Sequence, residues 1–293
     1  MIRVAGARGT VTTLDRPARR VVSLVPSITD ALFALGAGDR VSGRSDYCVE
    51  PRGEVESIPT VGGTKNASLD AVLALDPDLV LLNQEENTEA LWRGVAARGL
   101  AAHLSFPKTL ADAVSLTRDL ALLVGMDPDR LPVIADFARQ LAEAAERRRS
   151  RVPVRVFCPI WMDPLMTVSG ETFISDVLDL AGGENVFSGR ARRYPLAADV
   201  AGAPAWSDAR VGERDLRYPR VSLDEVVALA PEVVLLPDEP HPFSEADAEV
   251  FRALDIPAAR AGRVRRVEGK ALCWSSPRAG AALREVESWL HGP

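Results

Sequence analysis

Two stretches of the chain share one pattern of apolar and polar positions. Residues 68–86 contain Ser-Leu-Asp, an amphipathic run, a proline and then Leu-Val-Leu-Leu, and residues 222–240 repeat that order with Val-Val-Leu-Leu. Each copy predicts a helix that begins after a capping serine and ends before the proline, because proline has no N–H to donate and disfavours helical geometry in the residue before it. The unbroken Val and Leu runs predict parallel strands that are buried on both faces.

The segments that precede the two copies also match each other. Residues 31–45 and 177–191 each contain an amphipathic helix end, a glycine turn and a short apolar strand with Ser-Gly-Arg. Helix–Pro–strand units can recur by chance in α/β proteins, but two matches in the same order, half a chain apart, favour a repeat. The sequence therefore predicts an α/β fold with two similar lobes, each with a central, mostly parallel sheet.

Other segments complete this prediction. Residues 2–13 alternate weakly and predict an edge hairpin, while residues 19–27 predict a buried strand that ends at Pro26, with Ser27 as the cap of the next helix. Residues 126–151 keep one helical pattern for roughly 20 residues, which is longer than a typical domain helix. We expect this segment to be the single long backbone helix that joins an N-terminal lobe, residues 1–125, to a C-terminal lobe, residues 152–293.

Composition narrows the class of protein. The 293 residues are 47% hydrophobic and 26% charged, which is typical of a soluble globular protein. The net charge of -6 gives no indication of a nucleic-acid partner. Three widely spaced cysteines form neither a disulfide pattern nor a zinc pattern.

The N-terminus bears on the compartment. It has no apolar segment of signal-peptide length, and no run in the chain approaches the roughly 18 apolar residues that span a membrane. As written, the sequence predicts a cytoplasmic protein; if the protein is exported, a leader is missing from this sequence or the start site is misassigned.

Residues 188–220 are the least regular part of the chain. They contain seven arginines, two tyrosines and a tryptophan. A long irregular segment in a compact protein is either functional or disordered, and the aromatic residues argue against disorder. The pattern leaves open whether this segment is a lid or a surface for a partner.

Five motifs in this order resemble the helical-backbone class of ABC-transporter substrate-binding proteins, which includes vitamin B12-, haem- and ferric-siderophore-binding proteins. The motifs are VVSLVPSITD (21–30), SLDAVLALDPDLVLL (68–82), SGETFISDVLDLAGGENVF (169–187), YPRVSLDEVVALAPEVVLL (218–236) and WSSPR (274–278). The resemblance extends from about residue 19 to the C-terminus. It implies a monomeric binding protein of an ABC importer, extracytoplasmic in that role, with no cofactor of its own.

The same resemblance implies a site for a metal chelate, a corrinoid, haem or ferric siderophore, in the cleft between the lobes at the carboxyl ends of the strands. The residues that match this position are Pro26, Ser27, Tyr47, Thr64, Asn83, Trp161, Met166, Tyr218, Trp274 and Arg278. The aromatic members would offer flat apolar faces to a large ring, and core packing is the alternative for each.

The chain departs from vitamin B12 binders in lobe one, which lacks the expected tryptophans near Gly63–Thr64 and Asn83. A corrinoid site would therefore depend on lobe two. Anionic ferric siderophores favour arginine contacts. The candidate arginines, each with solvated surface arginine as the alternative, are Arg44, Arg192, Arg193 and Arg278.

Direct metal binding has little support in the sequence. A metal receptor uses several histidines and carboxylates that converge on one point. Of the three histidines, only His241, beside Asp238 and Glu239, is a candidate ligand, and an exposed loop histidine is the alternative. We predict no metal site formed by side chains alone.

Asp70 and Asp224 occupy equivalent places in the first turns of the twin helices. A carboxylate near a helix N-terminus is favourable in itself, so capping is one explanation. In the resembling family, acids at these places on the two lobes dock on arginines of the membrane permease, which makes this pair the predicted docking residues.

Two other functions stay open at this point. One is a cytoplasmic binder or carrier of such a ligand, and the other is an enzyme on a two-lobed scaffold, such as a chelatase. The sequence has no G-x-S-x-G, no Walker A motif and no G-x-G-x-x-G that opens a helix after a strand, so we predict no enzyme and no catalytic residues.

Overall fold

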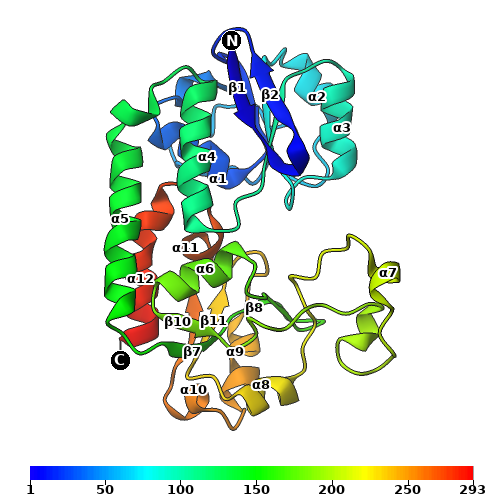
Figure 1. The fold of residues 1–293 in the computed structure, drawn as a ribbon, viewed down its shortest axis with the longest axis vertical. Helices are drawn as coiled ribbons and strands as arrows, with labels where there is room; N and C mark the ends of the chain where they lie inside the picture. The colour runs from blue at the N-terminus through cyan, green and yellow to red at the C-terminus, as the bar shows by residue number, and fades with distance from the viewer. Residues whose placement is uncertain (293) are drawn as a thin grey trace. The chain divides into compact units, whose positions relative to one another are not determined.

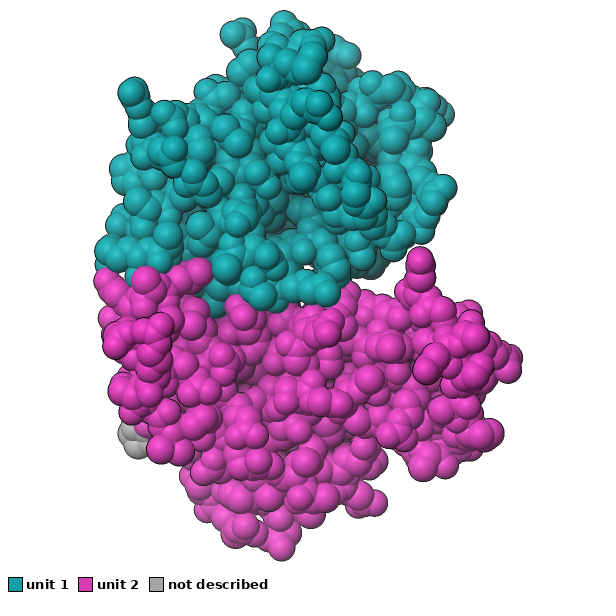
Figure 2. All heavy atoms as spheres, in the orientation of Figure 1, with its two compact units in different colours: residues 1–139, 274–280 teal, residues 140–273, 281–293 magenta. Residues whose placement is uncertain are grey.

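The computed structural model describes residues 1–292, and the chain divides into two compact units (Figure 2). Unit 1 contains residues 1–139 and 274–280, and unit 2 contains residues 140–273 and 281–293. Both units are α/β, as the sequence pattern predicts. None of the helices in the described part of the chain is long and apolar enough to cross a membrane.

A four-stranded parallel sheet forms the centre of unit 1 (Figure 1). In order across the sheet, the strands are β4 (Val41–Arg44), β3 (Val21–Ser23), β5 (Leu79–Asn83) and β6 (Ala102–Ser105). The predicted N-terminal hairpin is confirmed as β1 (Ile2–Ala5) paired antiparallel with β2 (Val11–Leu14).

Helices cover both faces of this sheet. They are α1 (Pro26–Ala34), α2 (Leu69–Ala74), α3 (Glu89–Ala97) and α4 (Leu110–Leu123), with short 3-10 turns η1 (Ala7–Gly9), η2 (Gly38–Arg40) and η3 (Pro128–Arg130). Leu79 and Leu81 of β5 pack into the core with α1 and α4, whereas Val80 and Leu82 pack into the core with α2 and α3. This two-sided burial explains why β5 has no polar alternation.

Unit 2 repeats the arrangement. Its parallel sheet has the order β10 (Gly183–Asn185), β7 (Val154–Phe157), β11 (Val233–Pro237) and β12 (Val264–Val267), and β8 (Pro159–Trp161) pairs antiparallel with β9 (Met166–Thr167). The helices of unit 2 are α6 (Phe173–Leu180), η4 (Leu196–Ala198), α7 (Asp208–Val211), α8 (Leu223–Leu229), α9 (Glu245–Arg252), α10 (Pro257–Arg260) and α11 (Lys270–Cys273). Phe157, Phe187 and Phe251 pack ring to ring in its core.

Two long helices belong partly to each unit. The division falls inside α5 (Pro132–Arg149) and inside α12 (Arg278–His291). Residues 126–151 were predicted as one helix, and the structure forms α5 there after the turn η3. In unit 2 the two helices are tied by Arg147, whose Nε donates to the buried carboxylate of Glu287 at 2.8 Å.

The helix starts of the repeat follow the capping prediction. Ser68 Oγ accepts the N–H of Ala71 at 3.2 Å, and Ser222 forms a full capping box with Glu225. The predicted cap at Ser27 is wrong. The helix α1 begins two residues earlier than this cap implies, at Pro26, with Val25 as the N-cap and no side-chain cap, because the fixed φ of proline suits the first helical position.

Candidate functional site

In unit 1, one buried amide side chain holds the loops at the carboxyl ends of the strands. Asn87 Oδ1 accepts the backbone N–H of Asn83 at 2.8 Å, and Asn87 Nδ2 donates to the carbonyls of Leu24 at 3.3 Å and Thr64 at 2.8 Å. The ends of β3 and β5 and the loop at residue 64 are thus fixed together. The sequence reasoning missed Asn87, although it follows a predicted buried strand by only a few residues.

The other predicted contacts of unit 1 differ in accessibility. Tyr47 is 63% exposed, whereas Ser27 and Asn83 are buried and Pro26 and Thr64 are partly buried. A Cβ atom on Gly63 would lie 3.1 Å from the Tyr47 ring, so a glycine there allows the ring to lie close to the loop. Tyr47 is the residue of this group that offers most of its surface.

Trp274 and Arg278 lie in unit 1, although the prediction grouped them with lobe two. Trp274 is only 5% exposed. The buried carboxylate of Asp30, on α1, accepts hydrogen bonds from Ser276 Oγ at 2.6 Å and from Arg278 at 2.8 Å. Because α1 holds this segment through Asp30, the Arg278 guanidinium already has a carboxylate partner within the unit.

In unit 2, aromatic side chains gather in the loops that follow β7 and β11. Trp161 is 43% exposed, and its ring centroid lies 5.1 Å from that of His241, which lies 4.7 Å from that of Phe243. The indole N–H donates to the carbonyl of Asp163 at 2.9 Å, which fixes the ring with part of its surface in solvent. The rings are tilted against one another, and Trp161, called the aromatic platform below, is the one that offers a large apolar face to solvent.

Backbone pairing extends this platform sideways. Trp161 pairs with Met166 across β8 and β9, and Met166 forms a further antiparallel bridge with Arg220. Residues that are directly opposite in an antiparallel pair share one face of the sheet, so these three side chains form a row. Tyr218, two residues before Arg220, lies on the same face. Trp161, Met166 and Tyr218, which were predicted together, are therefore neighbours.

Possible metal ligands do not converge. Within residues 1–292, no group of three or more His, Cys, Asp or Glu side chains is placed to hold a metal ion. His241 Nε2 lies 4.0 Å from Asp247 rather than beside Asp238, whose carboxylate accepts the N–H of Gly269 at 2.6 Å.

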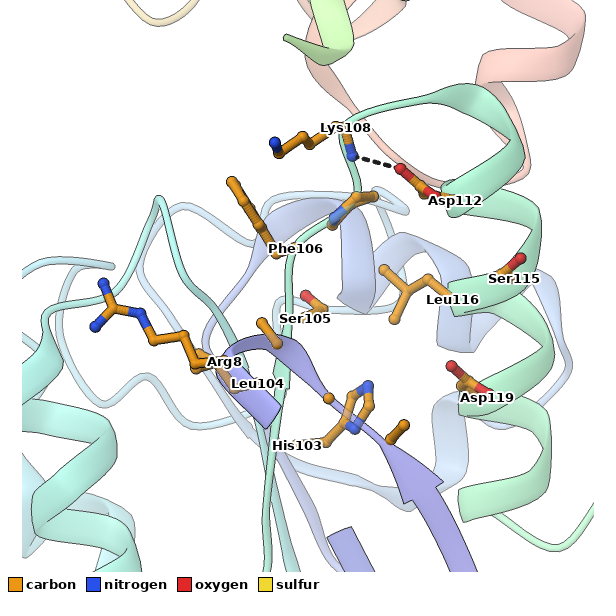
Figure 3. A pocket seen from close by; sticks show the side chains of 14 residues that line it. Arg8, His103, Leu104, Ser105, Phe106, Lys108, Asp112, Ser115, Leu116 and Asp119 are labelled. Atoms are coloured by element: carbon orange, nitrogen blue, oxygen red, sulfur yellow. Dashed lines mark hydrogen bonds between the residues drawn. The ribbon is translucent and has the colours of Figure 1, made fainter. Parts of the chain in front are cut away.

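Unit 1 also has a hollow of about 370 Å³ at the carboxyl end of β6 (Figure 3). It is lined by the turn between β1 and β2, by residues 103–108 and by one side of α4. His103 is buried in its floor, and burial lowers the pKa of this imidazole to about 4. Asp119, on the α4 side, is half-buried, and burial raises its pKa to about 6.

The hydrogen bonds of Thr12 define the tautomer of His103. Thr12 Oγ1 donates its single hydrogen to the carbonyl of Ala102 at 2.9 Å, and it lies 3.1 Å from His103 Nδ1. Since the hydroxyl hydrogen is already used, His103 Nδ1 is the donor in the second contact. The neutral ring therefore carries its proton on Nδ1. None of the residues predicted for the ligand site lines this hollow.

The four predicted arginines separate into two pairs. Arg44 donates to the carbonyls of Val55, Ser45 and Cys48, and Arg278 pairs with Asp30. By contrast, neither Arg192 nor Arg193 has an ion-pair partner within the described part of the chain. The two arginines of unit 1 therefore hold the fold, whereas the two of unit 2 form no ion pair within the described part of the chain.

Two α/β units, each with a central four-stranded parallel sheet, define a two-lobed fold. Residues 21–266 match the sequence profile described as periplasmic binding protein, which is most of the chain. The chain belongs to the periplasmic binding protein family.

One sequence relative and two solved structures show what the chain is similar to. A vitamin B12-binding protein of Vibrio parahaemolyticus is 29% identical over 280 residues, covering 94% of this chain and 90% of the relative. An apo periplasmic haem-binding protein from Roseiflexus sp. RS-1 has a TM-score of 0.75 at 21% identity, covering 94% of this chain and 98% of the other. The periplasmic vitamin B12-binding protein of Vibrio cholerae has a TM-score of 0.71 at 22% identity, covering 94% and 97%. At these identities the two structures show the shared fold, and all three relatives are named as binding proteins.

Proposed function

We propose that this protein is the substrate-binding protein of an ABC importer and that it captures a metal chelate of the corrinoid or haem class. Family membership and the names of the relatives support this ligand class. The observation that carries the proposal is the platform in unit 2, where Trp161 is 43% exposed and packs against His241 at the ends of the central strands. The protein acts by binding, without a catalytic step.

The ligand lies against Trp161, Met166 and Tyr218 in this proposal. A flat macrocycle buries apolar area on the indole and the thioether, while His241 offers an imidazole nitrogen from the same surface. A metal that arrives inside a chelate needs no cluster of protein carboxylates.

The test is a titration with cyanocobalamin, haemin and a set of ferric siderophores, followed by visible absorbance and tryptophan fluorescence. One class should bind saturably at micromolar concentration or below. Trp161→Ala should weaken that binding at least about 30-fold, since a central aromatic contact contributes ~2 kcal/mol or more. Trp92→Phe, on α3 of unit 1, is the matched control and should leave the affinity unchanged. No binding of any class by the wild-type protein would contradict the proposal.

We further propose that Asp70 and Asp224 dock this protein on its permease in the extracytoplasmic space. Both are exposed in the first turns of α2 and α8, and neither has an ion-pair partner in residues 1–292. Asp70→Lys with Asp224→Lys should abolish binding to the permease in liposomes and leave ligand affinity intact. The matched control reverses Asp39 and Asp255, which are also exposed. Equal permease binding by both double variants would refute the assignment.

A further inference from the structure

Residues 188–220 form an ordered layer in which arginines alternate with aromatic rings. Tyr194 and Trp206 stack with their centroids 6.0 Å apart, and the guanidinium of Arg210 lies 4.0 Å from the Trp206 centroid. Arg214 lies near both rings, at 5.3 Å from Trp206 and 5.7 Å from Tyr194, and Arg192 lies 5.3 Å from Tyr194. Cation–π contacts of this kind hold guanidinium groups in place without neutralising them.

One buried carboxylate fixes the two ends of this segment. Asp199 is 2% exposed and accepts the backbone N–H groups of Arg193 and Arg220, and it forms an ion pair with Arg190. Arg190 also pairs with Glu225 of α8. The two ends of the segment are thereby fixed to each other and to the repeat helix, so the arginines have defined positions.

Most arginines of the segment form no ion pair with a residue that the structure describes. Of its seven arginines, Arg190 pairs with Asp199 and Glu225, and Arg217 pairs with Asp215. The other five have no carboxylate within 4 Å among the residues that the structure describes: Arg192, Arg193, Arg210, Arg214 and Arg220. In a chain of net charge -6, such a concentration of unpaired cations is a local exception.

Two of these guanidinium groups also lack a hydrogen-bond acceptor. The Nε atoms of Arg192 and Arg220 are buried without a partner, and in residues 1–292 only Arg263 Nε shares this condition among side-chain atoms. Buried donors almost always have an acceptor in a native protein. Both orphan donors therefore indicate a place where an acceptor group is expected.

The arginines continue the aromatic platform of unit 2. Arg220 is the third member of the row that begins with Trp161 and Met166. The segment that contains Arg192 pairs with the segment that contains Arg220, because the Arg192 N–H donates to the carbonyl of Leu216 at 2.8 Å. Trp161, Met166 and Arg220 therefore lie on three adjacent segments, and Arg192 lies on a fourth. One end of this surface is apolar and the other is cationic.

We propose that residues 188–220 are the anion-recognition element of the ligand site, and that the chelate carries carboxylate or phosphate groups beside a flat apolar part. This inference rests on the proposed function. Guanidinium groups bind both kinds of oxyanion through paired N–H donors, and they do so most strongly when they are held in place and partly desolvated. Continuity with Trp161 favours a small-molecule ligand over a membrane surface as the partner of these charges.

The experiment compares probes that carry anionic groups with probes that lack them. Haemin is compared with its dimethyl ester in the same detergent, which changes only the two carboxylates. Cyanocobalamin is compared with dicyanocobinamide, which lacks the phosphate together with the ribose and the benzimidazole base. Wild-type protein should prefer the anionic member of the pair that it binds. Arg220→Gln and Arg192→Gln should each weaken the anionic probe about 10- to 100-fold, the expected loss for a hydrogen bond to a charged group. Both variants should leave the neutral probe within about 2-fold.

Arg260→Gln is the control, since Arg260 is an exposed arginine of unit 2 that is paired with Asp255. It should change neither affinity. If the wild-type protein binds a probe pair without preference, or if both arginine variants weaken the two members equally, the inference fails while the proposed function survives. If neither pair binds, both fail. A last measurement tests sedimentation of the protein with phosphatidylglycerol vesicles. If Arg210→Gln abolishes this sedimentation and leaves the probe preference unchanged, the arginines bind a membrane and the inference is overturned.

Discussion

The carboxyl ends of the two central sheets are built from similar strands but use their polar side chains differently. In unit 1 these side chains bind one another: Asn87 fixes three loops, and Asp30 holds Arg278. In unit 2 the equivalent edge leaves Trp161 43% exposed and five arginines of the neighbouring segment without carboxylates among the described residues. Satisfied polar groups stabilise the fold, whereas unsatisfied ones are available to a ligand.

This difference indicates that one copy of a duplicated fold can contribute mainly to stability and the other mainly to ligand binding. Substitutions at the edge of unit 1 should act mainly on the free energy of unfolding. Substitutions at the edge of unit 2 should act mainly on ligand affinity. The predictions below test this division, beginning with the largest expected effect.

Asn87→Ala should lower the free energy of unfolding by about 4 kcal/mol, because it leaves the N–H of Asn83 and two carbonyls without partners, at ~1–3 kcal/mol each. Arg220→Gln, at the edge of unit 2, should not lower it, because the change removes a buried N–H donor that has no acceptor in the protein. Urea unfolding followed by circular dichroism measures both values. If both variants lower the free energy of unfolding by similar amounts, the proposed division of stability and ligand binding between the units is wrong.

His103 should make the free energy of unfolding depend on pH below 7. The folded protein keeps this imidazole neutral down to its pKa of about 4, whereas in the unfolded chain it takes a proton near 6.5. The unfolded state therefore binds more protons between these values, and stability falls as the pH drops through this window, by about 3 kcal/mol in total.

His103→Gln keeps a donor for Thr12 and removes the titrating group. The difference between wild-type and variant unfolding free energies should therefore change between pH 7 and pH 4 and stay constant above pH 7. A difference that does not vary with pH would show that another group is responsible.

Asp119, in the same hollow, should act in the opposite direction. Burial raises the pKa of this carboxyl to about 6 from 3.8, so the folded protein retains the proton longer than the unfolded chain does. Stability therefore falls as the pH rises from about 4 to 6. Because the group is only half-buried, we expect about 1 kcal/mol rather than the full shift. Asp119→Asn should be the more stable protein at pH 7 and should lose that advantage at pH 3.5.

The regular elements of the fold could be predicted because each depends on local chemistry. The runs at Leu79–Leu82 and Val233–Leu236 indicate burial on both faces, and a serine before each helix is a local cap. The start of α1 was misplaced because Pro26 and Ser27 both favour a helix start and the proline was read as the end of the strand. When two adjacent residues both favour a helix start, the sequence alone does not show which one begins the helix.

The site could be predicted less completely, because it depends on long-range contacts. Trp161 and Met166 pair across β8 and β9, but their role in binding, together with that of Tyr218, stays a prediction. Nothing local indicates that Trp274 and Arg278 pack in unit 1 through Asp30, 248 residues from Arg278, or that Asn87 joins three loops. The alternation of arginines and rings in residues 188–220 likewise appears only after folding.

The smallest effect concerns the twin helices α2 and α8. Ser68 and Ser222 each accept one N–H of the first turn, at 3.2 Å in both copies, so Ser68→Ala and Ser222→Ala should each cost about 1 kcal/mol. Only α8 has the reciprocal bond, in which Glu225 accepts the N–H of Ser222 at 2.9 Å, and Glu225 also pairs with Arg190. Glu225→Ala should therefore also lower the free energy of unfolding. It should in addition speed amide hydrogen exchange in residues 188–220, because the segment loses its contact with α8. If Glu225→Ala leaves exchange in that segment unchanged, the repeat helix does not anchor the arginines, and the two copies are more alike than their edges suggest.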